Sequence, residues 1–345
     1  MAGGAAARRR RCLPQERDVA GAPAAVDDRL GLALTSRAGP PMSVFSTFAF
    51  ILVLLALGRV LRWRGVVPDN APDVLNLVAL YVCLPASILL HAPQLSFERE
   101  LLGLVAIPYI VLLFTVVVIW PLARALRFDR GSTACLLMQI PLGNTSFIGY
   151  ALVPVLAGSG ALGYALVYDQ LGTFILLVTW GLTIVAVFGG TEKPTPFGIV
   201  RRMLGFPPFL ALVFGLTLMP ADPPAAVRQS LEIVAGVLLP IIVLALGMQL
   251  RLRLPREHLA PLAIGLVTKL VLMPLLALGL CAAFGLTGDM RLAAVYETAM
   301  PSMVTAGALL SMAGLAPELA AAMIGYGIVL SMITLPLWHL VLGSL

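Results

Sequence analysis

Long apolar runs separated by short charged segments dominate the chain from Ser43 onward. A helix that spans a bilayer needs about twenty mostly apolar residues, and runs near that length recur along the chain. They are expected at 43–61, 71–91, 100–123, 132–157, 161–188, 207–220, 226–249, 259–285, 290–313 and 317–342. The pattern predicts an all-α polytopic membrane protein with ten transmembrane helices.

The composition supports this class, with 60% hydrophobic and 12% charged residues, whereas soluble proteins carry about 25% charged residues. The four cysteines and three histidines are scattered, so we expect no disulfide framework, metal site or cofactor. The net charge of +6 is carried by basic residues in the leader and in short loops, so no nucleic-acid partner is expected. An intramembrane enzyme stays an alternative, without a catalytic motif to support it.

Residues 1–42 are expected to be a separate segment. Seven of the 23 Lys and Arg residues fall within the first 41 positions, and no apolar core precedes Thr35. A signal peptide would need such a core. We therefore predict a disordered leader, and the alternative is that the protein starts at Met42 and the leader is not translated.

Basic residues indicate the orientation of the spans. The loops after the first, third, fifth and seventh spans each carry three Lys or Arg residues, and the opposite loops carry three in all. The positive-inside rule places the richer loops, including 191–206, in the cytoplasm and both ends of the ten-span body outside. The expected location is the inner (plasma) membrane of a bacterium.

Prolines recur at matching places in the two halves of the chain. Five spans followed by five must have opposite orientations, so 43–190 and 207–345 are predicted to be inverted repeats. Paired interruptions of this kind indicate the binding site of a transporter. The matched pairs are Pro85 and Pro240, Pro108 and Pro274, and Pro141 and Pro301, with Thr145 and Thr305 four residues after the last two.

The fourth and ninth spans contain helix-breaking residues where helix formers are expected. Proline and glycine disrupt helices, and unpaired backbone at membrane depth is tolerated only beside protein or a water-filled cavity. We predict two half-helices in each span, joined by extended segments near 141–144 and 300–303. The simpler alternative is two kinked helices without a site. The polar residues expected to cap the second half-helices are Asn144, Thr145, Ser146 and Ser302.

Two opposed helix N-termini, each worth roughly half a positive charge, would form a pocket for an anion. No arginine lies beside the breaks, and the nearest aromatics are Phe147, Tyr150 and Tyr296. A small mono- or dicarboxylate is therefore expected rather than a phosphate-rich or indole substrate. The candidate substrate-binding residues are Gln139, Pro141, Gly143, Asn144, Thr145, Met300, Pro301, Ser302 and Thr305.

Three ionisable residues, Asp169, Lys269 and Glu297, interrupt apolar runs. Such residues cost about 2.5–3.5 kcal/mol at the bilayer centre and usually have a partner or a function. We expect Lys269 to pair with Asp169, with Glu297 or with backbone carbonyls. Glu297 lies one turn before Pro301 and is expected to exchange a coupling proton; Asp169 is the competing candidate. Sodium is the alternative coupling ion.

Four stretches of the chain are specific enough to compare with known families, namely "GNTSFIG", "LLPIIVLALGMQL", "TKLVLMPLL" and "AMPSMVTAGALLSMAG". They resemble the auxin efflux carrier family, especially its bacterial permeases for malonate and malate, over 43–345. The resemblance implies ten helices in an inverted five-plus-five repeat, and broken helices four and nine that cross at the substrate site. It also implies a transport domain that moves against a scaffold. Asn144 matches the crossover asparagine of the family and Pro301 the crossover proline, and Gly143 stands where plant carriers have proline.

These features together predict a secondary transporter that moves small organic anions by an elevator-like form of alternating access. A sodium-coupled organic-anion symporter of the bile-acid-transporter type is the alternative. The expected partners are the substrate and the lipid bilayer, and the sequence leaves a homodimer open.

Overall fold

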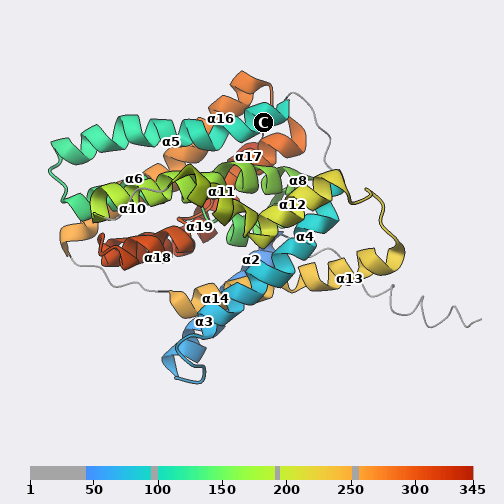
Figure 1. Ribbon diagram of the computed structural model, residues 1–345. Helices are drawn as coiled ribbons and strands as arrows, with labels where there is room; N and C mark the ends of the chain where they lie inside the picture. The colour runs from blue at the N-terminus through green and yellow to red at the C-terminus, as the bar shows by residue number, and fades with distance from the viewer. Residues whose placement is uncertain (1–43, 95–99, 191–194, 251–255, 345) are drawn as a thin grey trace, which may run out of the picture. The chain divides into compact units, whose positions relative to one another are not determined.

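The computed structural model describes residues 44–94, 100–190, 195–250 and 256–344, where the regular structure is helical except for one isolated β-bridge (Figure 1). The predicted leader, 1–42, lies outside these residues. Four of the basic residues used to predict the orientation also lie outside them, namely Arg99, Lys193, Arg251 and Arg253.

Helices occupy each of the predicted apolar runs. Within the described residues, six continuous helical stretches are long and apolar enough to cross a membrane, which identifies a multi-pass membrane protein. The helices α2 (Val44–Trp63) and the short α12 (Pro207–Thr217) occupy the first and sixth runs, and interrupted helices occupy the fourth and ninth. The six stretches are Ala71–Gln94, Glu100–Ala125, Gly160–Gly189, Ala225–Gln249, Arg256–Phe284 and Pro317–Gly343.

Two of the predicted prolines follow widened helical turns. The π-helical turn η1 (Ala79–Cys83) precedes α4 (Leu84–His91), which has Pro85 in its first turn. The π-turn η7 (Thr268–Leu272) likewise precedes α16 (Met273–Phe284), which begins with Met273 and Pro274. Proline lacks a backbone donor and clashes with the preceding turn, and a π-turn accommodates both effects without ending the span.

One group of helices packs around α14 (Leu238–Gln249). This helix packs along α2 and α3 (Ala71–Val78), while α12 and α13 (Ala225–Gly236) pack against α4. In Figure 1, α2, α3 and α14 lie together in the lower part of the view. The first, second, sixth and seventh runs therefore form one packed group.

The remaining runs form a second group. Here α16 packs against α5 (Glu100–Ala125) and α17 (Gly288–Ala299), and α17 packs against α8 (Gly160–Val167). The helix α18 (Val304–Met312) packs against α19 (Pro317–Gly343) and against α6 (Arg130–Gln139). The interrupted helices of the fourth and ninth runs therefore belong to one group.

Two glycines bring the backbones of α2 and α14 into direct contact. A Cβ atom added at Gly58 would overlap the carbonyl oxygen of Leu244, and one added at Gly247 would overlap that of Leu55. Small residues allow this close approach between membrane helices. The packing of the first group therefore depends on the absence of side chains at these two positions.

We predict that Gly247→Val destabilises the protein, because its side chain would push α14 away from α2. Overpacking of this kind typically costs about 1–3 kcal/mol, so thermal unfolding of the purified protein should shift to a lower temperature. Gly236→Ala is the matched control, because a Cβ added at Gly236 in the neighbouring α13 meets nothing within 4 Å. Equal melting temperatures for the two variants would contradict the proposed backbone contact.

Candidate functional site

The fourth and ninth runs are both interrupted at the predicted places. In the fourth run, α6 ends at Gln139, and helical structure resumes with the π-turn η3 (Thr145–Gly149), which continues into α7 (Tyr150–Ala157). In the ninth run, α17 ends at Ala299 and α18 begins at Val304. The predicted breaks near 141–144 and 300–303 are confirmed.

The two breaks are bonded to each other through their backbones. Gly143 and Ser302 form an isolated antiparallel bridge. The N–H of Asn144 donates to the carbonyl of Pro301 at 2.7 Å, and the N–H of Met303 donates to the carbonyl of Leu142 at 3.0 Å. In this pairing, Gly143 and Ser302 direct their own N–H and carbonyl groups away from the opposite segment. Two breaks that are far apart in sequence thus form one site. We call the paired segments 142–144 and 301–303 the bridge.

Gln139 holds the two sides of the bridge together. Its backbone carbonyl accepts a hydrogen bond from Ser302 Oγ at 3.2 Å. With its amide nitrogen facing Met303, its side chain donates to the Met303 carbonyl and accepts from the Gly307 N–H, each at 3.3 Å. The candidate Gln139 is therefore fully buried and hydrogen-bonded, and its contacts connect the end of α6 to the second break.

The prediction that polar side chains cap the second half-helices is wrong. Asn144 precedes η3 and Met303 precedes α18, and neither side chain makes a capping hydrogen bond. Asn144 has φ −80° and ψ 58°, whereas a capping residue usually has extended geometry. Ser302 bonds to Gln139, and the hydroxyls of Thr145 and Ser146 are drawn to a carboxylate, a stronger acceptor than a neutral group.

Asn144 instead keeps an unpaired amide group. Its side-chain nitrogen has no hydrogen-bond partner among the described residues, although only 1% of the residue is exposed. A buried donor without a partner costs about 1–3 kcal/mol. An unsatisfied donor at the bridge is a group that a bound anion could satisfy.

The carboxylate beside the start of η3 belongs to Asp169, in the π-turn η4 (Tyr168–Thr173). The side chain is fully buried and accepts four hydrogen bonds, so it attaches the first turn after the break to the fifth run. The donors are Thr145 Oγ1, Ser146 Oγ at 2.6 Å, Tyr150 OH at 2.5 Å and Gln170 Nε2 at 2.8 Å.

Lys269 lies against the other side of the bridge. Its Nζ donates to the carbonyl of Thr298 at 3.2 Å, and it would lie 3.1 Å from a Cβ atom at Gly143. The predicted pairing with a backbone carbonyl is confirmed. No ion pair joins Lys269 to Asp169 or Glu297 within the described residues, so that alternative is not seen. The ammonium group of Lys269 therefore lies beside the bridge. It has three N–H donors, and the bond to Thr298 uses one of them.

Glu297 occupies the last turn before the second break. It is fully buried, and neither oxygen of its carboxyl group has a hydrogen-bond partner among the described residues. The carboxyl lies against Gly149, where an added Cβ atom would be 2.7 Å from Glu297 Cδ. Asp169, Lys269 and Glu297 thus surround the bridge and η3 from three different elements.

The other candidate substrate-binding residues differ in how far they are buried. Pro141, Met300 and Pro301 are buried within the two breaks, whereas Thr305 is exposed on α18. The sequence match between Thr145 and Thr305 therefore does not extend to their surroundings. Sequence reasoning missed Tyr150, Gln170, Gly149 and Thr298 as members of the site, although Gln170 stands next to Asp169 in the motif "YDQLG".

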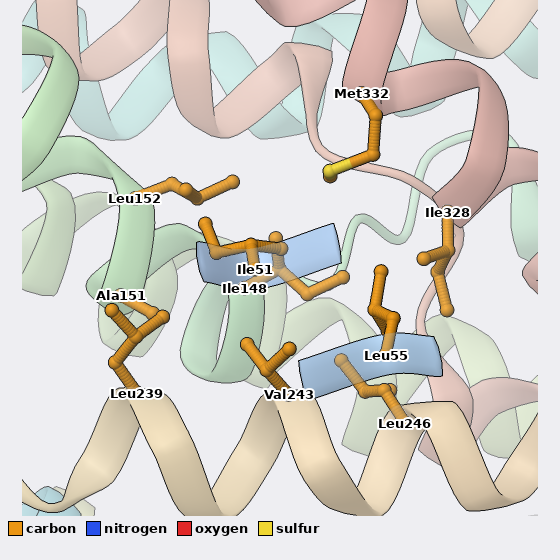
Figure 2. Close-up of a pocket in the computed structure, with 10 residues that line it drawn as sticks. All are labelled: Ile51, Leu55, Ile148, Ala151, Leu152, Leu239, Val243, Leu246, Ile328 and Met332. Atoms are coloured by element: carbon orange, nitrogen blue, oxygen red, sulfur yellow. The ribbon is translucent and has the colours of Figure 1, made fainter. Parts of the chain in front are cut away.

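A small apolar cavity lies where the first group of helices meets η3, α7 and α19 (Figure 2). Every residue that lines it is apolar, so it has no group that could bind an anion, and we place the candidate site at the bridge. The lining residues are Ile51 and Leu55 of α2, Ile148 of η3, Ala151 and Leu152 of α7, Leu239, Val243 and Leu246 of α14, and Ile328 and Met332 of α19.

Comparisons with known proteins agree with a transport role. The chain is 29% identical to an uncharacterized transporter of Methanothermobacter thermautotrophicus, over 87% of this chain and 99% of the relative. It is 22% identical to an uncharacterized transporter of Methanocaldococcus jannaschii, over 85% of this chain and 96% of the relative. The family described as "Membrane transport protein" matches residues 43–339. The chain therefore belongs to this family of membrane transporters, the auxin efflux carrier family.

Proposed function

We propose that the protein is a secondary transporter that carries small organic anions, mono- or dicarboxylates, across the inner membrane by alternating access. The observation that carries this proposal is the bridge between Gly143 and Ser302. Interrupted helices that meet at membrane depth are typical of transporter binding sites, and here two breaks from distant parts of the chain share one buried site.

The hydrogen-bond donors of the site favour an anion. Lys269 Nζ lies next to Gly143 and uses one of its donors on Thr298. The amide nitrogen of Asn144 is buried without a partner among the described residues. A carboxylate is an acceptor that could satisfy both groups, because hydrogen bonds between charged partners are about twice as strong as neutral ones. We assign substrate binding to these two residues, supported by the backbone of Gly143, Pro301 and Ser302.

The architecture that we propose has ten spans in two inverted repeats, 43–190 and 207–345, joined by a cytoplasmic loop at 191–206. The breaks of the fourth and ninth spans would then be related by the repeat and cross at the bridge. With an even number of spans, both ends of the body would lie on the same side, and the basic loops favour the side outside the cytoplasm.

The packing suggests which parts move. The helices around α14 would be the scaffold, and the group that contains both breaks would be the transport domain. The cavity in Figure 2 lies at their contact, and its lining is entirely apolar. An apolar lining of this kind suits sliding of one group past the other.

Coupling to a cation completes the proposal. Moving one charge against the membrane potential costs about 2.3 kcal/mol per 100 mV, so anion import needs a cotransported cation. We propose a proton as the coupling ion. Sodium is the second candidate, because the bridge leaves the carbonyls of Gly143 and Ser302 directed away from their pairing.

Substrate class can be tested by thermal-shift screening of the purified protein against a panel of carboxylates. We expect malonate and malate to raise the melting temperature more than indole-3-acetate does. A ligand at about 100 times its Kd stabilises a protein by about 2.7 kcal/mol. Stabilisation only by cations or neutral sugars would contradict the anion assignment.

Replacing Asn144 is expected to reduce transport without unfolding the protein. Asn144→Ala removes a donor that has no partner among the described residues, so the melting temperature should fall little. Losing a hydrogen bond to a charged ligand costs about 1.5–3 kcal/mol. This predicts that malonate uptake into proteoliposomes needs roughly a 10- to 100-fold higher malonate concentration to reach half its maximal rate. Thr305→Ala, at an exposed position nearby, is the control. Normal uptake by a folded Asn144→Ala protein would refute the site.

Lys269→Met tests the buried cation. Methionine is apolar and close to lysine in length, and it removes the cost of burying an ammonium group, so the variant should remain folded. We expect malonate to lose its stabilising effect on the variant in the thermal-shift assay. If malonate stabilises Lys269→Met and wild type equally, Lys269 does not bind the substrate.

A further inference from the structure

Two buried carboxyl groups flank the first turn of the second half-helix in the fourth span, and their surroundings differ. Asp169 accepts hydrogen bonds from four side chains. Glu297 is equally buried, yet both of its oxygens lack a hydrogen-bond partner among the described residues. The expected coupling residue Glu297 and its competitor Asp169 are therefore chemically distinct.

Hydrogen bonding determines which form of a buried acid is stable. A buried carboxylate needs donors or an opposite charge, because removing a bare anion from water is costly. Asp169 has donors enough for the charged form. Glu297 has none among the described residues, and the neighbouring Lys269 donates to the carbonyl of Thr298 instead. The arrangement around Glu297 suits the neutral, protonated acid.

Gly149 leaves the space that the Glu297 carboxyl occupies. A methyl group at Gly149 would lie 2.7 Å from Glu297 Cδ, so the carboxyl can occupy this place only because residue 149 has no side chain. Gly149 closes the π-turn that begins directly after Asn144. The backbone carbonyl of Glu297 also accepts from the N–H of Met300 at 3.3 Å, inside the second break. Glu297 therefore contacts both interrupted helices.

We propose that Glu297 is the proton-binding site of the transporter, that Gly149 positions its carboxyl, and that Asp169 is a permanent anion that anchors η3. This inference rests on the proposed function. Glu297 takes up one proton on a carboxyl oxygen when it packs against Gly149. It releases the proton to water when the bridge region rearranges and exposes it. Proton uptake and release are thus tied to the position of η3, which follows Asn144 directly and ends at Gly149.

Other titratable groups lie around Glu297, and of these only Asp169 is replaced in the variants used below. Asp169, Lys269, Tyr150 and Tyr168 are close enough to interact with it electrostatically. Among the described residues of the elements packed against α17, further groups include Cys281 of α16 and His339 of α19, which hydrogen-bonds to Tyr296 at 2.8 Å.

Infrared spectroscopy of the purified protein tests the protonation directly, without any substrate. A protonated carboxyl group gives a carbonyl band that shifts in D₂O, and exposed acids do not contribute at neutral pH because they are ionised. We expect this band in the wild type and in Asp169→Asn, and its loss in Glu297→Gln. A band that survives Glu297→Gln, or its absence from the wild type at neutral pH, would overturn the proposal.

The role of Gly149 has its own matched pair of variants. Gly149→Ala should displace the Glu297 carboxyl and change the pH at which its infrared band disappears. Gly279→Ala is the control, because a Cβ atom at this glycine of α16 meets nothing within 4 Å. Identical titration of the band in Gly149→Ala, Gly279→Ala and the wild type would show that Gly149 does not position the carboxyl.

Transport measurements link the proton to the substrate. In proteoliposomes, a pH gradient should drive accumulation of labelled malonate by the wild type. Glu297→Gln should lose that accumulation and exchange malonate at a rate that no longer changes with pH. Accumulation by Glu297→Gln under a pH gradient, or wild-type accumulation that follows sodium and not pH, would overturn the coupling role. If the wild type carries no carboxylate while the infrared band belongs to Glu297, the anion assignment fails and the proton site stands.

Discussion

The structure depends on one constraint, which is that backbone hydrogen bonds broken inside a membrane must be made elsewhere in the protein. Proline and glycine interrupt the fourth and ninth runs, and water does not reach a buried break. Each break supplies the other with a donor and an acceptor, through the bonds from Asn144 to Pro301 and from Met303 to Leu142. The two interruptions are therefore stable only as a pair, and the pairing creates a polar site within an apolar protein.

The polar side chains around the bridge follow from the same constraint. A helix that restarts at Thr145 presents hydroxyl groups to the interior, and Asp169 accepts from the first two of them. Lys269 donates to a carbonyl in the last turn before the second break. Asp169 thus lies where hydroxyl groups can donate to it, and Lys269 lies where a backbone carbonyl can accept from it. The amide nitrogen of Asn144 and the carboxyl oxygens of Glu297 have no partner among the described residues, and in our proposal they serve a ligand and a proton.

Glycines determine how closely the elements approach one another. Gly58 and Gly247 let two helix backbones touch, Gly149 admits the Glu297 carboxyl, and Gly143 leaves space for Lys269. In each case a methyl group would overlap or crowd the neighbouring atoms. The close backbone contact of α2 with α14 contrasts with the contact between this pair and α7, where an entirely apolar cavity lies between them (Figure 2).

The sequence by itself determined the helical membrane class, the apolar runs and the location of both breaks, because these depend on local hydrophobicity and on the helix-breaking chemistry of proline and glycine. Only the tertiary structure decided which groups pair. Asn144, Thr145 and Ser146 have capping chemistry, but the backbone of Asn144 is bonded to Pro301, and a carboxylate from another span accepts from the hydroxyls of Thr145 and Ser146. Asp169 and Glu297 look alike in sequence, but hydroxyl donors from η3 and α7 reach only Asp169, and Glu297 has no donor among the described residues. Local pattern cannot report such contacts, because they arise when separate helices pack.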